Sequence, residues 1–127
     1  MAKAKKSIPF PFVLDNLFSM EPVVKPMFGS HAVYVEGKIV MVLRDKGDYD
    51  SGVWIGTSKE YHESLKKEFP KMHSITIWGT GVTGWQVLSE EEDDFEESVN
   101  RLCDLIIKRD PRIGKIPKPK KKKTAKS

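Results

Sequence analysis

The stretch PMFGSHAVYVEGKIVMVL, residues 26–43, decides the fold. Residues 31–36 and 38–44 are rich in β-branched side chains, which favour extended strands, and Glu36-Gly37 lies between them. A two-residue hairpin turn needs positions that tolerate a positive φ, and glycine does so freely. The sequence therefore predicts a β-hairpin that turns at Glu36-Gly37.

The second strand of this hairpin is apolar on both of its sides. Ile39, Met41 and Leu43 alternate with Val40 and Val42. A strand whose two alternating sets are both apolar is typical of the centre of a sheet that is covered on both faces. We therefore expect helices packed over a sheet.

The remaining elements follow from hydrophobic period and from helix start signals. Residues 57–60 and 89–92 have the spacing of a capping box, in which a hydroxyl and a carboxylate three residues apart close a helix N-terminus. The expected elements are a short helix opening at Pro11, an extended segment over 23–28, strands over 53–57, 74–78 and 85–88, and helices over about 58–69 and 90–108.

Together these elements predict an α+β fold. The sheet is expected to be mostly antiparallel, with about five to six strands in two hairpin units, and to carry three helices. The order along the chain is one helix, three or four strands, a second helix, two strands and a third helix.

Charge divides the chain into a body and two ends. Residues 7–107 hold 9 Lys and Arg against 17 Asp and Glu, whereas residues 108–127 hold ten against one, so the net charge of +4 hides a segregation. Lysine-rich, proline-interrupted ends bury too little apolar surface to fold. We expect a basic disordered arm at 1–10, one domain at 11–108 and a Lys-rich disordered tail at 109–127.

The cysteine content and the hydropathy of the chain indicate the cellular compartment in which we expect the protein. Cys103 is the only cysteine, so an intrachain disulfide is impossible, and no apolar run is long enough to cross a bilayer. Nothing resembles a signal peptide. The expectation is a cytoplasmic protein without a membrane partner.

Two motifs suggest chemistry that their context does not favour. Residues 79–84, GTGVTG, match a dinucleotide fingerprint, but a strand is predicted at 85–88 where a phosphate-binding turn needs a helix N-terminus. We interpret residues 79–84 as a hairpin loop and expect no cofactor. His62-Glu63 resembles the start of a zinc-protease helix, but Lys66 stands where the second histidine is required.

No other set of residues indicates catalysis. His31 and His73 lie on different predicted elements, and Cys103 lies beside the apolar stripe of the last helix, where a buried thiol is the common case. No Ser/His/Asp or Cys/His set occurs at suggestive positions. We expect no metal site, no small-molecule substrate and no enzymatic activity.

The C-terminal lysines are the candidate contact with another macromolecule. Mobile cations displace counterions from phosphates, which gives sequence-independent nucleic-acid binding that weakens with salt. A solubilising arm is an equal alternative, and docking of the tail on the seven acids of residues 90–97 is a further hypothesis. The lysines concerned are Lys115, Lys118, Lys120, Lys121, Lys122 and Lys123.

Tryptophans offer an alternative contact surface. Trp54, Trp78 and Trp85 lie on predicted strands, where core packing is the ordinary role. If Trp78 and Trp85 instead point outward from one hairpin, they would form a surface for a protein partner or a second copy.

The first half of the domain resembles a known family. Residues 13–42 are similar to the N-terminal domain of the TfoX competence regulators, through the turn Pro26, Met27, Phe28 and Gly29 and the hairpin that follows it; Ser30 stands where the family has a second glycine. The resemblance weakens over the rest of 12–108 and extends to MmcQ/YjbR-like domains. It implies an α+β domain of bacterial cytoplasmic regulators with no agreed enzymatic activity.

These observations favour a non-enzymatic regulatory or binding module that associates with nucleic acid through its Lys-rich tail. The alternative is a protein-interaction module, a homodimer, with no role at nucleic acid.

Overall fold

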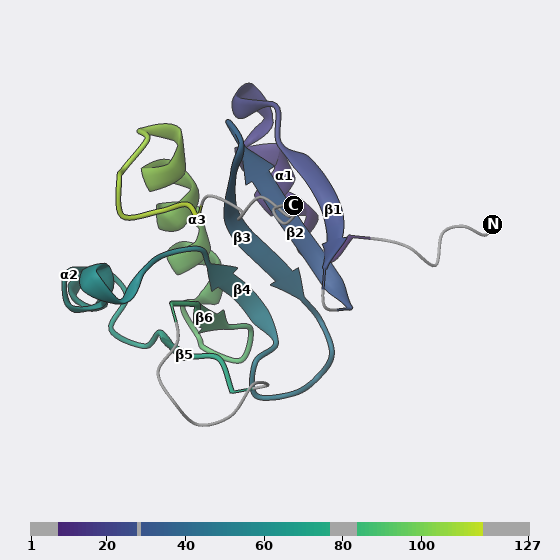
Figure 1. Ribbon diagram of the computed structural model, residues 1–127. Coiled ribbons are helices and arrows are strands. Elements are labelled where there is room, and N and C mark those ends of the chain that lie inside the picture. Colours follow the sequence, from purple (N-terminus) through teal and green to yellow (C-terminus); the bar gives the residue numbers. More distant parts are fainter. Residues whose placement is uncertain (1–7, 28, 77–83, 116–127) are drawn as a thin grey trace, which may run out of the picture.

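The computed structural model describes residues 8–27, 29–76 and 84–115, which form one antiparallel sheet and three α-helices (Figure 1). The strands are β1 (Val23–Met27), β2 (Ser30–Val35), β3 (Lys38–Arg44), β4 (Gly52–Ile55), β5 (His73–Ser74) and β6 (Gln86–Ser89). The helices are α1 (Pro11–Asn16), α2 (His62–Glu68) and α3 (Phe95–Ile107), with 3-10 turns η2 (Phe18–Met20) and η3 (Lys59–Tyr61). The predicted α+β fold and its order of elements are confirmed.

The decisive hairpin forms where the sequence predicts it. Val35 pairs with Lys38, and the two turn residues between them both have positive φ, 54° at Glu36 and 82° at Gly37. This conformation matches the right-handed twist of the flanking strands. β3 then pairs with β4 and lies inside the sheet, as expected for a strand that is apolar on both sides.

The sheet does not follow chain order at its far end. Its strands are arranged β1-β2-β3-β4-β6-β5, so β6 lies between β4 and the edge strand β5. β5 and β6 pair antiparallel, which confirms the second hairpin within the described residues. Residues 77–83, which include Trp78 and most of the glycine-rich loop, lie outside them.

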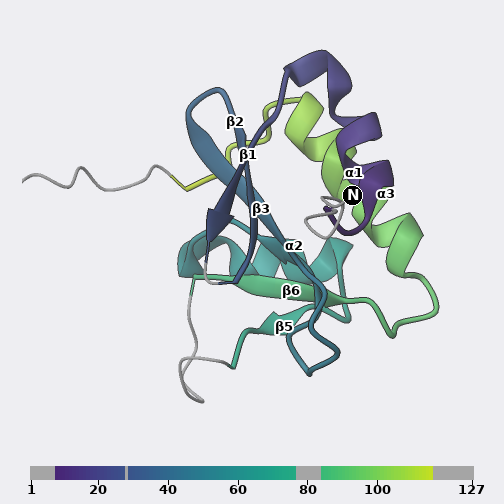
Figure 2. The same ribbon diagram turned by 90° about the vertical axis from the view of Figure 1, so that its right-hand side faces the viewer.

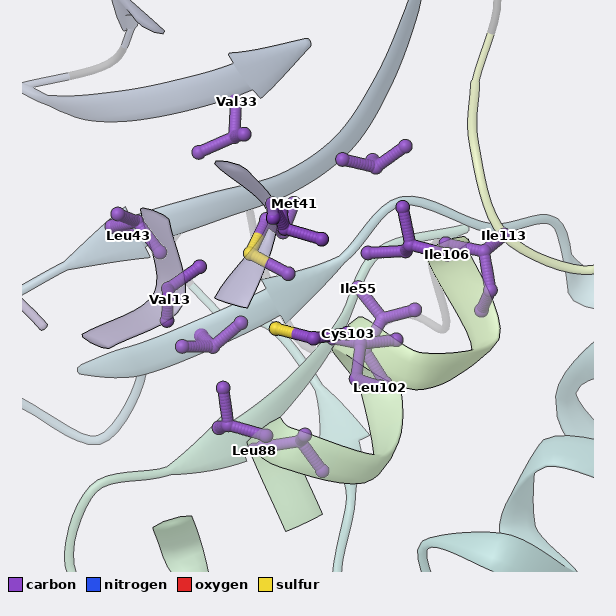
Figure 3. Close-up of a cluster of buried hydrophobic side chains, with 14 of the residues drawn as sticks. Val13, Val33, Met41, Leu43, Ile55, Leu88, Leu102, Cys103, Ile106 and Ile113 are labelled. Carbon is purple, nitrogen blue, oxygen red and sulfur yellow. The ribbon is translucent and has the colours of Figure 1, made fainter. Parts of the chain in front are cut away.

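One face of the sheet carries the helices. Figure 2 shows α1 and α3 side by side on this face, and Figure 3 shows the side chains that fill the space beneath them. Met41 and Ile55 from the sheet are fully buried there, and so is Leu102 of α3. Val13 and Leu17 of α1 and Leu65 of α2 belong to the same cluster, so all three helices share one core.

The opposite face of the sheet has its own, smaller cluster. Among the described residues this cluster contains no helical residue, and we call the surface the helix-free face. Its centre is Trp54, which is fully buried and packs against Trp85 with ring centroids 5.8 Å apart. The cluster consists of Ala32, Ile39, Val42, Trp54, Ile75, Trp85 and Val87, with Met27 and Tyr34 packed against it.

The last helix begins later than predicted. α3 starts at Phe95 and not near residue 90, because the Ser89 hydroxyl accepts the backbone N–H of Glu91 within a turn and caps no helix. The capping box at 89–92 is therefore wrong. The middle helix agrees better, since η3 and α2 together cover 59–68.

Residues on both sides of the predicted domain, 11–108, pack on it. Phe10 packs edge-to-face on Phe95, with centroids 5.2 Å apart, and Ile113 is only 4 % exposed. A charge averaged over a whole end does not reveal a single apolar residue within it. Phe10 and Ile113 are such residues, and both pack on the helix-covered core. The described part of each predicted disordered end, residues 8–10 and 109–115, is packed on the domain.

Candidate functional site

The family-like turn joins β1 to β2. Pro26 and Met27 end β1, Met27 pairs with Ser30, and Gly29 has a φ of 74°, which L side chains rarely adopt. Phe28 lies outside the described residues. The predicted turn therefore has a structural role, since it reverses the chain so that β1 can pair with β2.

A cavity of about 300 Å³ lies beside this turn. We call it the turn cavity. Its walls come from the N-terminal segment, from the start of β2 and from the end of β3 with the loop that follows. The lining residues are Pro9, Gly29, Ser30, His31, Leu43, Asp45 and Lys46.

Two buried polar atoms on β2, next to the turn cavity, have no partner within the described chain. Ser30 is 4 % exposed, and within the described chain neither its hydroxyl nor Nδ1 of His31 has a hydrogen-bond partner. Lys46 makes no ion pair with a described residue. Its ammonium lies over the turn, 3.6 Å from the point where a Cβ on Gly29 would be. Buried polar groups are normally paired, so these two atoms are exceptions, and as neighbours on β2 Ser30 and His31 point to opposite faces of the sheet.

A second feature is the C-terminal strap, residues 109–115, which crosses the domain after α3. Arg112 is its centre. The guanidinium donates to the carboxylates of Glu68 (2.6 Å) and Asp110 (2.8 Å) and to the Ser64 hydroxyl (3.0 Å). The Thr57 hydroxyl donates to the backbone carbonyl of Arg112 at 2.7 Å. Arg112 thus ties the strap to α2 and to the end of β4.

The strap ends against the sheet. Lys115 exchanges backbone hydrogen bonds with Ile39, and its ammonium donates to the Thr57 carbonyl at 3.2 Å and lies 5.7 Å from the Trp85 ring centroid. Of the six lysines predicted to contact nucleic acid, Lys115 is the one within the described residues, and its ammonium is engaged by the domain. The other five, Lys118, Lys120, Lys121, Lys122 and Lys123, lie outside the described residues.

Charges divide between the sheet and the helices. The six described strands contain Lys25, Lys38 and Arg44 and no acid, whereas the helical segments contain seven acids and four basic residues. On the helix-free face the ammonium of Lys25 lies 5.1 Å from the Tyr34 ring centroid. Arg44 is paired with Asp48 at 2.6 Å, and Lys38 lies opposite Val35 of the helix-covered cluster. Lys25 is therefore the one basic residue of the described strands that lies on the helix-free face without an ion pair, while the helical layer carries more acids than basic residues.

Hydrogen bonds shift several pKa values in the strap and in the loop after β3. The bond from Arg112 lowers the pKa of Asp110, and bonds to Asp110 and Glu68 raise the pKa of Arg112. In the loop, the bond from Arg44 lowers the pKa of Asp48. Each shift favours the charged pair, so these groups act as structural ion pairs and not as proton carriers.

The thiol and the histidines offer no catalytic set within the described chain. Burial raises the pKa of Cys103 to about 11, so the thiol stays protonated. His62 Nε2 lies 3.4 Å from the Gly84 carbonyl, and burial lowers the pKa of His73. No described group of three His, Cys, Asp or Glu residues could hold a metal ion.

Among the described residues, Lys71 forms ion pairs with the acidic segment, residues 90–97. Lys71 lies 3.6 Å from a Glu92 carboxylate oxygen and 3.7 Å from one of Asp94. Residues 118–123, the hypothesised partner, lie outside the described residues. Glu90 is partly buried, and this burial, with the nearby Asp45 charge, raises the pKa of its carboxyl.

Sequence reasoning missed one buried anchor. Asp50 is 1 % exposed, and its carboxylate accepts both the backbone N–H and the hydroxyl of Thr76, while its carbonyl accepts the Trp54 indole N–H at 2.8 Å. The sequence carries no signal for this anchor, because the indole bonds to a backbone carbonyl and the partner of the carboxylate, Thr76, lies 26 residues away. Trp54 and Trp85 are buried as expected for core residues.

No family model, curated protein or solved structure matches the chain. No helix among the described residues is long and apolar enough to cross a membrane.

Proposed function

We propose that the chain is a non-enzymatic binding module, of the type of the TfoX N-terminal domain, that holds nucleic acid between its helix-free face and its Lys-rich C-terminal segment. The observation that carries this proposal is the division of charge by layer. Phosphates are repelled by a helical layer with seven acids against four basic residues and attracted by Lys25 on the helix-free face, whose strands contain no acid. A body of negative net charge can thus bind a polyanion in one orientation.

The strap supports the proposal by fixing where the lysines begin. Lys115 is bonded to Ile39, a member of the helix-free cluster. Because each residue spans at most about 3.6 Å, Lys118 lies within about 11 Å of Lys115. Lys120, Lys121, Lys122 and Lys123 follow directly. The run of lysines therefore begins three residues after Lys115, whose backbone is bonded to β3.

The test is a titration of labelled duplex DNA at several salt concentrations. Replacing Lys118 and Lys120–Lys123 by Gln should abolish most of the affinity and flatten the salt dependence, by about 0.9 in log–log slope for each phosphate that is no longer neutralised. Lys25→Gln on the helix-free face should weaken binding a few-fold.

The matched control is Lys67→Gln, which removes an exposed lysine from α2 in the acidic layer. Its affinity should equal that of the wild type. The proposal is wrong if no salt-sensitive binding occurs at low salt, or if Lys67→Gln and Lys25→Gln weaken binding equally.

A second candidate function, a homodimer, is favoured by exposed apolar side chains beside the edge strand β1. Phe18 is 81 % exposed and Val23 is 52 % exposed. An edge strand can pair antiparallel with the same strand of a second copy, and Pro26 would confine such pairing to Val23–Lys25. Sedimentation velocity should then show a dimer that Phe18→Ser dissociates, whereas Tyr49→Ser, a change at an exposed ring on another loop, leaves it intact.

A further inference from the structure

An exposed groove of about 480 Å³ lies where α1 is followed by η2 and the start of β1, and we call it the α1 groove. Phe18, which is 81 % exposed, forms an apolar wall with Leu14 and Pro22. Asp15 and Glu21 also line the groove, and neither makes an ion pair with a described residue. The lining residues are Leu14, Asp15, Phe18, Ser19, Glu21 and Pro22.

The chemistry of the α1 groove suits a lysine-rich segment. A lysine side chain packs its apolar stem on an apolar surface while its ammonium pairs with a carboxylate. An ammonium above an exposed Phe ring gains a further attraction from the face of the ring. The Lys-rich segment, residues 116–127, contains six lysines and no acid. Its charge is therefore complementary to that of Asp15 and Glu21.

The Lys-rich segment begins within reach of the α1 groove. Val23, the residue after the groove, pairs with Tyr34. Tyr34 pairs with Ile39, and Ile39 pairs with Lys115, so these residues form one row across the sheet. Three spacings between neighbouring strands place Val23 roughly 14 Å from Lys115. Because each residue spans at most about 3.6 Å, Lys120 can lie up to about 18 Å from Lys115.

The acidic segment lies at the other end of the sheet. Ser89, the residue before this segment, pairs with Gly52, which pairs with Arg44 at the end of β3. Lys115 lies instead beside Ile39, near the start of β3. Figure 2 shows the turn after α1 towards one end of the domain and the segment between β6 and α3 towards the other. The α1 groove is therefore the better placed acceptor for the Lys-rich segment.

We propose that the Lys-rich segment docks in the α1 groove of its own chain, with its lysines on Asp15 and Glu21, and that nucleic acid has to displace it. Docking itself does not depend on nucleic-acid binding, whereas its regulatory consequence rests on the proposed function. A lysine cannot pair with a carboxylate and a phosphate at once. Docking therefore lowers the apparent affinity for DNA according to the fraction of chains in which the groove is occupied.

The direct test is paramagnetic broadening of amide NMR signals in the full chain. A nitroxide is attached at Thr124→Cys, and the buried, protonated thiol of Cys103 stays unlabelled. The amides of residues 14–22 should broaden at low salt. This broadening should disappear at about 1 M salt, because exposed charges are then screened over a few ångströms.

Two matched variants separate the groove from a general charge effect. Asp15→Asn with Glu21→Gln should remove the broadening of residues 14–22. Glu91→Gln with Asp93→Asn removes the same charge from exposed positions of the acidic segment and should leave the broadening unchanged. In a DNA titration at low salt, the groove variant should bind about threefold more tightly than this control, as expected for the loss of weak exposed ion pairs.

A mixing experiment identifies the chain that supplies the segment. ¹⁵N-labelled protein without a nitroxide is mixed with an equal amount of unlabelled protein that carries the nitroxide at position 124. Docking within one chain should leave the ¹⁵N spectrum sharp. Broadening of residues 14–22 in the mixture would show that a second copy fills the groove, which would overturn the proposal.

Two further results would also overturn it. The first is equal broadening of residues 14–22 in the wild type and in the groove variant. The second is an equal gain in DNA affinity for the groove variant and its control. If DNA does not bind but the selective broadening is present, the proposed function fails and docking stands. If DNA binds without selective broadening, docking alone fails.

Discussion

The two faces of the sheet are buried by different kinds of side chain. The helix-covered face has nineteen buried residues in its cluster, drawn from three helices, the sheet and the strap, whereas the helix-free face has seven among the described residues. The first cluster is built from many aliphatic side chains, and the second depends on Trp54 and Trp85. A helical layer is therefore not needed to bury a sheet face when two large rings cover its centre.

The largest expected effect tests whether the helix-free face is a core. Trp54→Ala should lower the free energy of unfolding by about 4 kcal/mol, because the ring is fully buried and packs on Trp85. Leu102→Ala on the helix-covered face should cost about 3 kcal/mol. Urea denaturation measures both. A loss below about 1 kcal/mol for Trp54→Ala would show that this face is a surface covering and not a core.

The next effect concerns the strap, which contacts both faces. Arg112→Met should lower the free energy of unfolding by about 2 kcal/mol, because the side chain is 19 % exposed and its loss leaves Asp110 unpaired and Glu68 with the more distant Arg101 alone. Arg101→Met is the control. Arg101 is 60 % exposed and lies 3.6 Å from Glu68, so its loss should cost about 0.5 kcal/mol or less.

The difference in stability between the wild type and Arg112→Met should decrease as the pH falls. The pKa of Asp110 is lowered in the folded protein from 3.8, so its ion pair stabilises the fold above that value and is lost as the pH falls below it. Thermal unfolding of the wild type and of Arg112→Met should therefore converge between about pH 4 and pH 2. A gap that stays constant over this interval would mean that Arg112 acts through packing alone.

Two serine substitutions should change the free energy of unfolding by a smaller amount and in opposite directions. Ser30→Ala should raise the free energy of unfolding by about 1 kcal/mol, because it removes a buried hydroxyl without a described partner. Ser74→Ala should lower it by about 1 kcal/mol, because the Ser74 hydroxyl accepts the buried Gln86 amide at 2.7 Å. Equal signs in differential scanning calorimetry would contradict the assignment of Ser30 as unpaired.

The smallest expected effect is that the Cys103 thiol, buried on the helix-covered face, does not react in the native protein. Burial raises the pKa of Cys103 to about 11, so a disulfide reagent at pH 8 should leave the native protein unlabelled and label it fully in concentrated guanidinium chloride. Rapid labelling of the native protein would show that α3 detaches readily from the sheet.

The sequence predictions were accurate where neighbouring residues determine the structure and less accurate where contacts between distant residues determine it. The hairpin turn was predictable because Gly37 adopts a positive φ freely and lies between two runs of β-branched residues. The start of α3 was not, because a serine can accept a backbone N–H in a turn as well as at a helix N-terminus, and Ser89 does so in a turn. The packing of the strap was not predictable either, because Ile113 is one of few apolar residues in a basic segment and its partners are distant in sequence.

The candidate site was less accessible to sequence reasoning than the fold. The resemblance located the turn at residues 26–29 but gave no reason to expect a cavity beside it. Ser30 and His31 line the cavity together with Pro9 and Lys46, which lie far from them in sequence. Convergence of residues from three segments has no period and no spacing. The basic character of the strands, by contrast, was present in the sequence and became visible only when charge was counted by element.

The strap also has a kinetic consequence. Thr57 is bonded to Arg112 across 55 residues and to Lys115 across 58, so the entropy of closing a long loop must be overcome before these contacts form. The strands from β1 to β4 follow one another and can associate first. Attachment of the strap is then a late event on the folding pathway, and weakening it should accelerate unfolding while the refolding rate stays almost constant.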